Sequence, residues 1–151
     1  MAEENVCVLY VIRKMVLMNK EELIKYITEN YGVDVEFPWK KYPNNIVFRH
    51  RNNKKWFVLI MTVSKEKLGI LECGTIDIMN VKCETIMINS FRAENGIYAA
   101  YHMNKANWIS VALDGSVNDE KIKMLIDISF RLTAPKIRKK KIQNHEIKNN
   151  L

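Results

Sequence analysis

Apolar side chains recur at helical spacing in two parts of the chain. The first series follows Asn19, whose side-chain oxygen suits an N-cap, and consists of Leu23, Ile24, Ile27 and Tyr31. Gly32 is a natural left-handed stop, so we expect a helix over about Lys20–Tyr31. The second series follows a capping pattern of Ser116 with Asp119 and consists of Ile122, Leu125, Ile126 and Phe130. We expect that helix to reach about Leu132, with Pro135 ending the globular part.

Alternating or continuous apolar runs between these helices predict strands. The segments with this pattern are Val33–Phe37, Ile46–Arg51, Lys55–Val63, Thr75–Val81 and Trp108–Leu113. Asn52 and Asn53 tolerate positive φ, so they predict a tight hairpin turn between the second and third segments. Glu84–Phe91 is expected to form a short helix, and Asn95 with Gly96 a turn.

The order of these elements predicts an α+β domain of two layers, in which an antiparallel sheet carries the helices on one face. A length of 151 residues suits one domain, which we place at residues 18–134. Residues 1–17 form an N-terminal extension, either an added strand or arm or sequence upstream of a start at Met18. Residues 135–151 form a basic C-terminal tail.

The net charge of +7 is unevenly distributed along the chain. The tail has six basic residues against one acid, which leaves only +2 for residues 1–134. Within that body, Pro38–Lys55 contains no Asp or Glu, and its basic residues are Lys40, Lys41, Arg49, Arg51, Lys54 and Lys55. Alternate residues of a strand share a face, so we expect Arg49 and Arg51 to project together, opposite Phe48.

Aromatic residues alternate with these cations, as in Trp39-Lys-Lys-Tyr42 and Lys54-Lys-Trp-Phe57. Cations can meet phosphates while rings contact bases, so the pattern predicts a nucleic-acid-binding hairpin. The alternative is that the charges only keep an exposed sheet face soluble.

Catalytic and metal-binding patterns are missing from the sequence. Cys7, Cys73 and Cys83 form no C-x-x-C pair, the three histidines lie far apart, and there is no nucleophile elbow or phosphate-binding glycine loop. We therefore expect a protein without enzymatic activity, cofactor or metal. The apolar run Val6–Ile12 is too short for a membrane helix, which favours a cytoplasmic protein without membrane contact.

A cluster before the last strand combines polar and aromatic groups, and consists of His102, Asn104, Lys105 and Trp108. It suits the binding of an anion, with Lys105 as the charge and Asn104 as a hydrogen-bonding partner. The alternative is structural, with Trp108 anchoring the core and Asn104 capping its own turn.

The stretch Tyr101–Trp108, followed by Val111-Ala-Leu-Asp-Gly-Ser116, Asp119 and Leu125–Ser129, resembles the signature of the YjbR/MmcQ family. The resemblance extends over about Met18–Thr133, and the motif residues that match one by one include His102, Asn104, Lys105, Trp108, Asp114, Gly115 and Ser116. It implies the α-β(3)-α-β(2)-α order of a fold like those of type III secretion chaperones and frataxin-like CyaY proteins. The acidic ridge that binds iron in frataxin-like proteins has no counterpart here, because Lys20 and Lys25 are interspersed with the acids of the first helix.

The family is usually described as DNA-binding and bacterial. We therefore expect a non-catalytic DNA-binding protein that uses the basic hairpin and Lys105, acting as a monomer or weak dimer. The alternative is an adaptor that binds proteins or peptides with a secretion-chaperone-like fold. A third possibility is a small-ligand site around the four residues of the cluster before the last strand.

Overall fold

The computed structural model describes residues 18–137, and its helices and strands follow the expected α-β(3)-α-β(2)-α order. They are α2 (Lys20–Tyr31), β1 (Ile46–Arg49), β2 (Trp56–Ser64), the 3₁₀ helix η1 (Lys65–Leu68), β3 (Thr75–Lys82), the 3₁₀ helix η2 (Thr85–Met87), α3 (Ile88–Arg92), β4 (Ile97–Ala99), β5 (Trp108–Ala112) and α4 (Asp119–Thr133).

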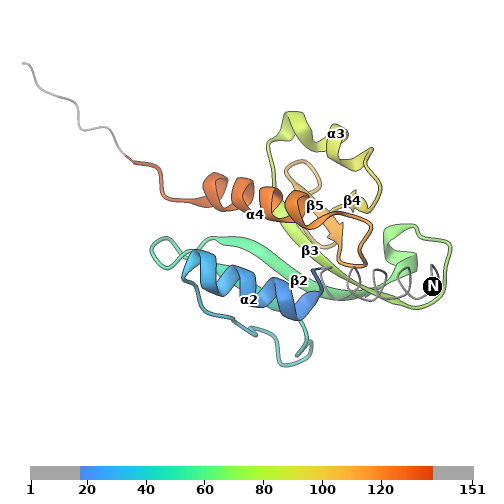
Figure 1. Cartoon of the computed structure of the whole chain (residues 1–151), viewed down its shortest axis with the longest axis horizontal. Helices are drawn as coiled ribbons and strands as arrows, with labels where there is room; N and C mark the ends of the chain where they lie inside the picture. Colours follow the sequence, from blue (N-terminus) through green and yellow to red (C-terminus); the bar gives the residue numbers. More distant parts are fainter. Residues whose placement is uncertain (1–17, 138–151) are drawn as a thin grey trace, which may run out of the picture.

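The strands form one antiparallel sheet in the order β1-β2-β3-β5-β4, and α4 packs on β2 and β3 beside α2 (Figure 1). Alternate side chains of each strand point to opposite faces, so the sheet has two apolar faces. Phe48, Val58, Ile60, Met79 and Val81 pack with Leu23 and Ile27 of α2 and Leu125 and Ile126 of α4. This confirms the expected two-layer α+β fold.

The other face of the sheet, which we call the open face, is covered by side chains from loops, from η1 and from β2 and β4 instead of by an α-helix. Its buried residues are Val47, Leu59, Met61, Val63, Ile76, Ile78 and Ala112. Aromatic and aliphatic side chains packed against them include Trp39, Trp56, Leu68, Tyr98, Tyr101 and Met103.

No helix among residues 18–137 is long and apolar enough to cross a membrane.

The first helix has the predicted bounds and caps, whereas the predicted cap of the last helix is wrong. Asn19 accepts a hydrogen bond from the Glu22 N–H at 2.9 Å, and Gly32 has φ 60°. The N-cap of α4 is Asn118, not Ser116. Ser116 instead donates both its N–H and its hydroxyl to Asp114 within a tight turn.

Two predictions about the first strands are also wrong. Val33–Phe37 forms only an isolated bridge, from Glu36 to Val47, because the segment leaves β1 after one pair. In the hairpin, positive φ falls on Lys54 (61°) and not on the two asparagines. Asn53 instead donates its side-chain amide to the Thr133 carbonyl at 2.8 Å, which fixes the hairpin tip against the C-terminal end of α4.

The predicted turn at Gly96 is present, with φ 82°. A Cβ at this position would collide with the Ser116 hydroxyl, so glycine is required for space as well as for backbone conformation. The turn ahead of α4 and the turn that opens β4 are therefore packed directly against each other. The strand β4, at three residues, is too short to leave a pattern in the sequence.

A buried polar pair links β3 and β5 to the loop after β4. The Ser110 hydroxyl donates to Asn80 Oδ1 at 2.5 Å and accepts the Tyr101 N–H at 2.9 Å. The Asn80 amide donates to the Tyr101 carbonyl at 3.1 Å. Both backbone groups of Tyr101 are thus paired with side chains that are fully buried in the sheet.

His50 joins the hairpin to α4 from inside the core. Its ring is 4% exposed and packs on Phe57 and Phe130, with centroids 5.2 and 4.2 Å away. Its Nε2 lies 2.8 Å from the Thr133 hydroxyl oxygen, and that hydroxyl donates to the Ser129 carbonyl, so Nε2–H is the donor to it. Burial lowers the pKa of His50 from its ordinary value.

Replacing Ser110→Ala should destabilise the protein by about 1–3 kcal/mol, because the Asn80 oxygen and the Tyr101 N–H would both be buried without a partner. Urea unfolding followed by circular dichroism measures this loss. The same change at exposed Ser90 is the matched control and should have little effect. Equal midpoints for the two variants would contradict the role given to the Asn80–Ser110 pair.

Stability should fall on acidification, and His50 should account for part of the fall. Its folded-state pKa is lowered, so the unfolded chain binds more protons and the contribution of His50 is complete only above about pH 6.5. It is lost as the pH drops from there through the folded-state pKa. Urea midpoints measured across this range should depend less on pH in His50→Gln than in the parent. The exposed and non-titratable Ser90→Ala is the control and should retain the parent's dependence.

Candidate functional site

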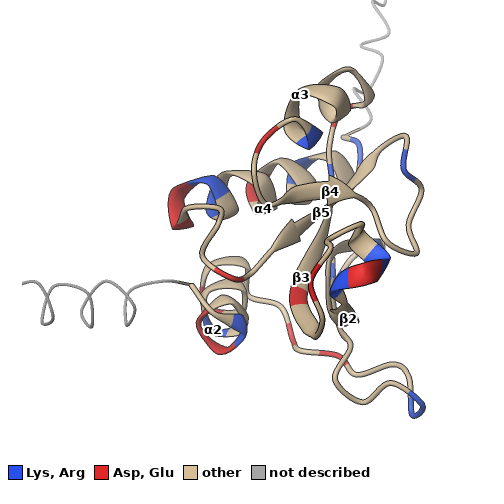
Figure 2. Ribbon diagram, turned by 90° about the vertical axis from the view of Figure 1, so that its right-hand side faces the viewer, with Lys and Arg blue, Asp and Glu red and all other residues tan. Residues whose placement is uncertain are grey.

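The basic residues singled out from the sequence occupy separate places in the fold. Lys40 and Lys41 lie in the loop before β1, whereas Arg51, Lys54 and Lys55 belong to the hairpin between β1 and β2. Lys105 lies in the loop between β4 and β5. Figure 2 shows Lys and Arg at several distinct places on the ribbon and not along one stripe.

Acidic residues that precede the acid-free stretch pair with both hairpin arginines. Arg49 Nε lies 2.6 Å from a Glu36 carboxylate oxygen, and an Arg51 nitrogen lies 3.6 Å from one of Asp34. The bridge from Glu36 to Val47 brings these acids alongside β1. β1 also ends at Arg49, with a register shift after Phe48, so the regular alternation expected through Arg51 does not hold. The hairpin is therefore less positive than its own sequence indicates.

Lys54 and Lys55, at the hairpin tip, are exposed and make no ion pair with another described residue. The tip lies at the same end of the molecule as the C-terminal end of α4 (Figure 1), in agreement with the bond from Asn53 to Thr133. The exposed Lys136 follows α4, and the remaining tail cations lie outside the described residues. We call Arg51, Lys54, Lys55 and Lys136 the basic end.

The residues of the cluster before the last strand do not share one closed pocket. Trp108 begins β5 and is 9% exposed, and the Asn104 side chain accepts the Ala106 N–H at 2.9 Å. These two residues therefore have the structural roles that the sequence left open. His102 and Lys105 are exposed and line two neighbouring pockets.

The first of these, the aromatic pocket, has a volume of about 460 Å³ and lies on the open face. Its rings come from the loop before β1, from β2 and from the loop after β4, and they are Trp39, Tyr42, Trp56, Tyr101 and His102. Aliphatic floor and wall residues include Leu59, Met61 and Met103. His102 has φ 57°, and its ring centroid lies 3.9 Å from that of Tyr101.

The second, the cationic pocket, has a volume of about 290 Å³ and is lined by Lys67, Arg92 and Lys105. Lys67 and Tyr101 line both pockets, so the two are contiguous. Among the described residues, no Asp or Glu lines either one. The sequence pointed to Lys105 alone, because Lys67 and Arg92 come from distant segments and carry no local signal.

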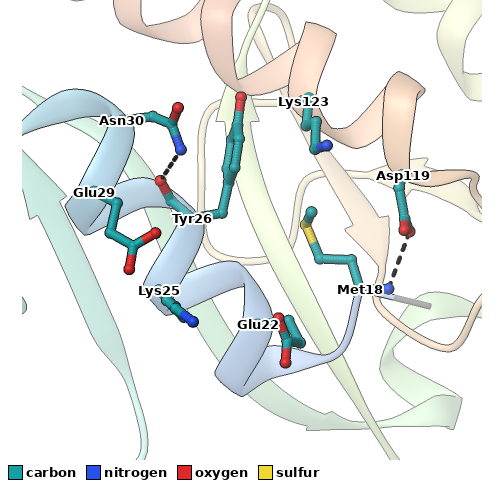
Figure 3. Close-up of a pocket in the computed structure, with 8 residues that line it drawn as sticks. All are labelled: Met18, Glu22, Lys25, Tyr26, Glu29, Asn30, Asp119 and Lys123. Atoms are coloured by element: carbon teal, nitrogen blue, oxygen red, sulfur yellow. Dashed lines mark hydrogen bonds between the residues drawn. The ribbon is translucent and has the colours of Figure 1, made fainter. Parts of the chain in front are cut away.

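A third pocket, of about 440 Å³, lies between α2 and the start of α4 (Figure 3). The Met18 N–H donates to Asp119 at its edge, at 3.0 Å. The charged lining is mixed, with Glu22, Glu29 and Asp119 opposed by Lys25 and Lys123. Such a lining favours neither cations nor anions.

Residues 18–137 contain no group of three or more His, Cys, Asp or Glu side chains that could hold a metal ion. Burial raises the pKa of the Cys83 thiol to about 11, so this thiol is protonated at neutral pH and a poor nucleophile. Cys73 is exposed, and Cys7 lies outside the described residues.

Comparison with known proteins finds similar sequences and structures from bacteria. The YjbR family model matches residues 28–132. The uncharacterised protein YyaQ of Bacillus subtilis (strain 168) is 42% identical over 117 residues, which is 78% of this chain and 99% of YyaQ.

Solved structures from two other bacteria have the same fold. A crystal structure of a Pseudomonas syringae protein has a TM-score of 0.76 at 40% identity, covering 78% of this chain and all of that one. A solution structure from the same organism has a TM-score of 0.74 at 38% identity, covering 82% of this chain and 99% of that one. The Deinococcus radiodurans protein DR2400, with a DUF419 domain, has a TM-score of 0.58 at 21% identity, covering 77% of this chain and 78% of that one. At this identity the similarity shows the fold alone. The match over residues 28–132 and the identity to YyaQ show that this chain belongs to the YjbR family.

Proposed function

We propose that this protein is a non-catalytic nucleic-acid-binding protein, with DNA as its ligand, and that the basic end contacts the phosphate backbone. The observation that carries the proposal is the docking of the hairpin tip on α4. It gathers Lys54, Lys55 and Lys136 at the place where the basic tail begins.

Charge supports this choice of surface. Arg49 is engaged by Glu36, whereas Lys54 and Lys55 make no ion pair with another described residue. Cations without a carboxylate partner can neutralise phosphates and release condensed counterions. The tail residues Arg138, Lys139, Lys140 and Lys141 add to this charge in the sequence.

Rigidity supports it as well. The tip is fixed by the hydrogen bond from Asn53 to Thr133, and the buried His50 is held against the same helix turn. Cations on a fixed loop lose less conformational freedom on binding than cations on a mobile one. Contacts to phosphates alone position a protein on DNA without reading sequence, so we expect weak base preference.

The adaptor alternative has less support. Large exposed apolar side chains are distributed over separate elements, for example Phe37 before β1, Leu71 after η1 and Ile86 in η2. A protein-binding surface would instead favour one contiguous apolar patch of several hundred Å².

Fluorescence anisotropy with a labelled DNA duplex over a salt series tests the proposal. Replacing Lys54→Ala/Lys55→Ala should weaken binding and reduce the slope of log affinity against log salt by about 2, since each phosphate contact contributes about 0.9. Replacing Arg138, Lys139, Lys140 and Lys141 with serine in the full-length chain should reduce this slope further.

The charge-matched control is Lys25→Ala/Lys123→Ala, at the pocket of Figure 3 near the opposite end of α4. It should retain the parent slope. Equal slopes for the two double variants, or binding no tighter than millimolar at low salt, would overturn the proposal.

A further inference from the structure

We propose that the aromatic and cationic pockets together form a nucleotide-binding site, with the base in the aromatic pocket and the phosphate in the cationic pocket. This site uses other residues than the basic end and does not depend on binding of duplex DNA. In a duplex, each base is stacked between its neighbours, so the pocket would take a free nucleotide or an unpaired one in a strand.

The aromatic pocket has the size and the lining of a small-molecule site. Its volume of about 460 Å³ lies within the usual range for such sites, and rings from three segments surround it. Nucleobases stack on aromatic side chains regardless of their sequence. Asn45 also lines the pocket at 9% exposure, and its side-chain amide makes no hydrogen bond to another described residue. It is therefore available for the polar edge of a base.

The rings of Trp39 and Trp56 and the backbone of Tyr101 are held in place before any ligand binds. The rings of Trp39 and Trp56 pack edge to face, with their centroids 5.6 Å apart. The Arg49 guanidinium lies 5.6 Å from the Trp56 ring centroid. On the other side, Asn80 and Ser110 hold the backbone of Tyr101 from below. A site that is already formed binds more tightly than one that must be ordered.

The cationic pocket provides the charge complement of a phosphate. Lys67, Arg92 and Lys105 come from η1, the end of α3 and the β4–β5 loop, and none makes an ion pair with another described residue. Their mutual repulsion is not relieved by any acid in the lining. An anion would relieve it, and arginine with lysine is the usual combination around phosphate.

The junction between the pockets selects a ligand that has both groups. Lys67 and Tyr101 line both, so a base and a phosphate joined by one sugar can reach the two at once. A nucleoside would leave the cations unpaired, and inorganic phosphate would leave the aromatic pocket unfilled. Each of these halves should bind more weakly than the nucleotide.

Isothermal titration calorimetry on the full-length chain, with adenosine 5′-monophosphate, adenosine and inorganic phosphate as probes, tests the inference. The monophosphate should bind at least about tenfold more tightly than either half, because charge-assisted hydrogen bonds add to stacking. A 5′-phosphorylated single-stranded oligonucleotide identifies the source. Binding that is tighter than that of the monophosphate and that Arg92→Ala/Lys105→Ala weakens indicates a nucleotide within a strand, and weaker binding indicates a free one.

Two variants separate the pockets. Arg92→Ala/Lys105→Ala should weaken binding of the monophosphate about tenfold or more and leave binding of adenosine unchanged. Tyr42→Ala should weaken binding of both. Arg92, Lys105 and Tyr42 are exposed, so circular dichroism should show intact folds. If the double variant fails to fold, Lys105→Glu provides the same test with one substitution.

The charge-matched control, Lys25→Ala/Lys123→Ala, and the basic-end variant, Lys54→Ala/Lys55→Ala, should both bind the monophosphate as the parent does. Adenosine binding as tightly as its monophosphate, or an unchanged affinity in the Arg92→Ala/Lys105→Ala variant, would overturn the inference. Neither result bears on duplex binding by the basic end, so the two proposals can fail separately.

Discussion

The five-stranded sheet has two apolar faces, but α-helices cover only one of them. The rest of the structure depends on how the second face is covered. An apolar sheet face left in water would promote association. Here the second face is covered by large side chains from loops, from η1 and from β2 and β4, and no α-helix lies over it. The aromatic pocket is the space that this loop cover leaves open above Leu59 and Met61.

The same constraint explains why polar groups are buried beneath that cover. A loop lying on a sheet must satisfy its backbone without a partner strand, and Asn80 with Ser110 does this for Tyr101. On the helical side, His50 and Thr133 have a comparable role, because they join the hairpin to α4 within the apolar core. Both faces therefore rely on a few specific hydrogen bonds as well as on apolar burial.

Local signals predicted most of the fold, and long-range contacts decided what they missed. The caps of α2 lie within a few residues of the helix and could be located from Asn19 and Gly32. Ser116 and Asn118 are equally good caps by local criteria, and only the turn at Asp114 decides between them. The pairing of Arg49 with Glu36 depends on a bridge between separate segments. For the same reason, Lys67 and Arg92 could not have been grouped with Lys105 from the sequence.

The bond from Met18 to Asp119 has a practical consequence for anyone who handles this protein. It places the start of the described chain at the N-terminal end of α4, whereas residues after 133 leave from the other end of that helix, about 20 Å away by the helical rise. A label attached at residues 134–137 would therefore stand near the hairpin tip, which is bonded to Thr133. One attached at Met18 would lie at the other end of α4, which makes Met18 the better position for a probe that must leave the basic end free.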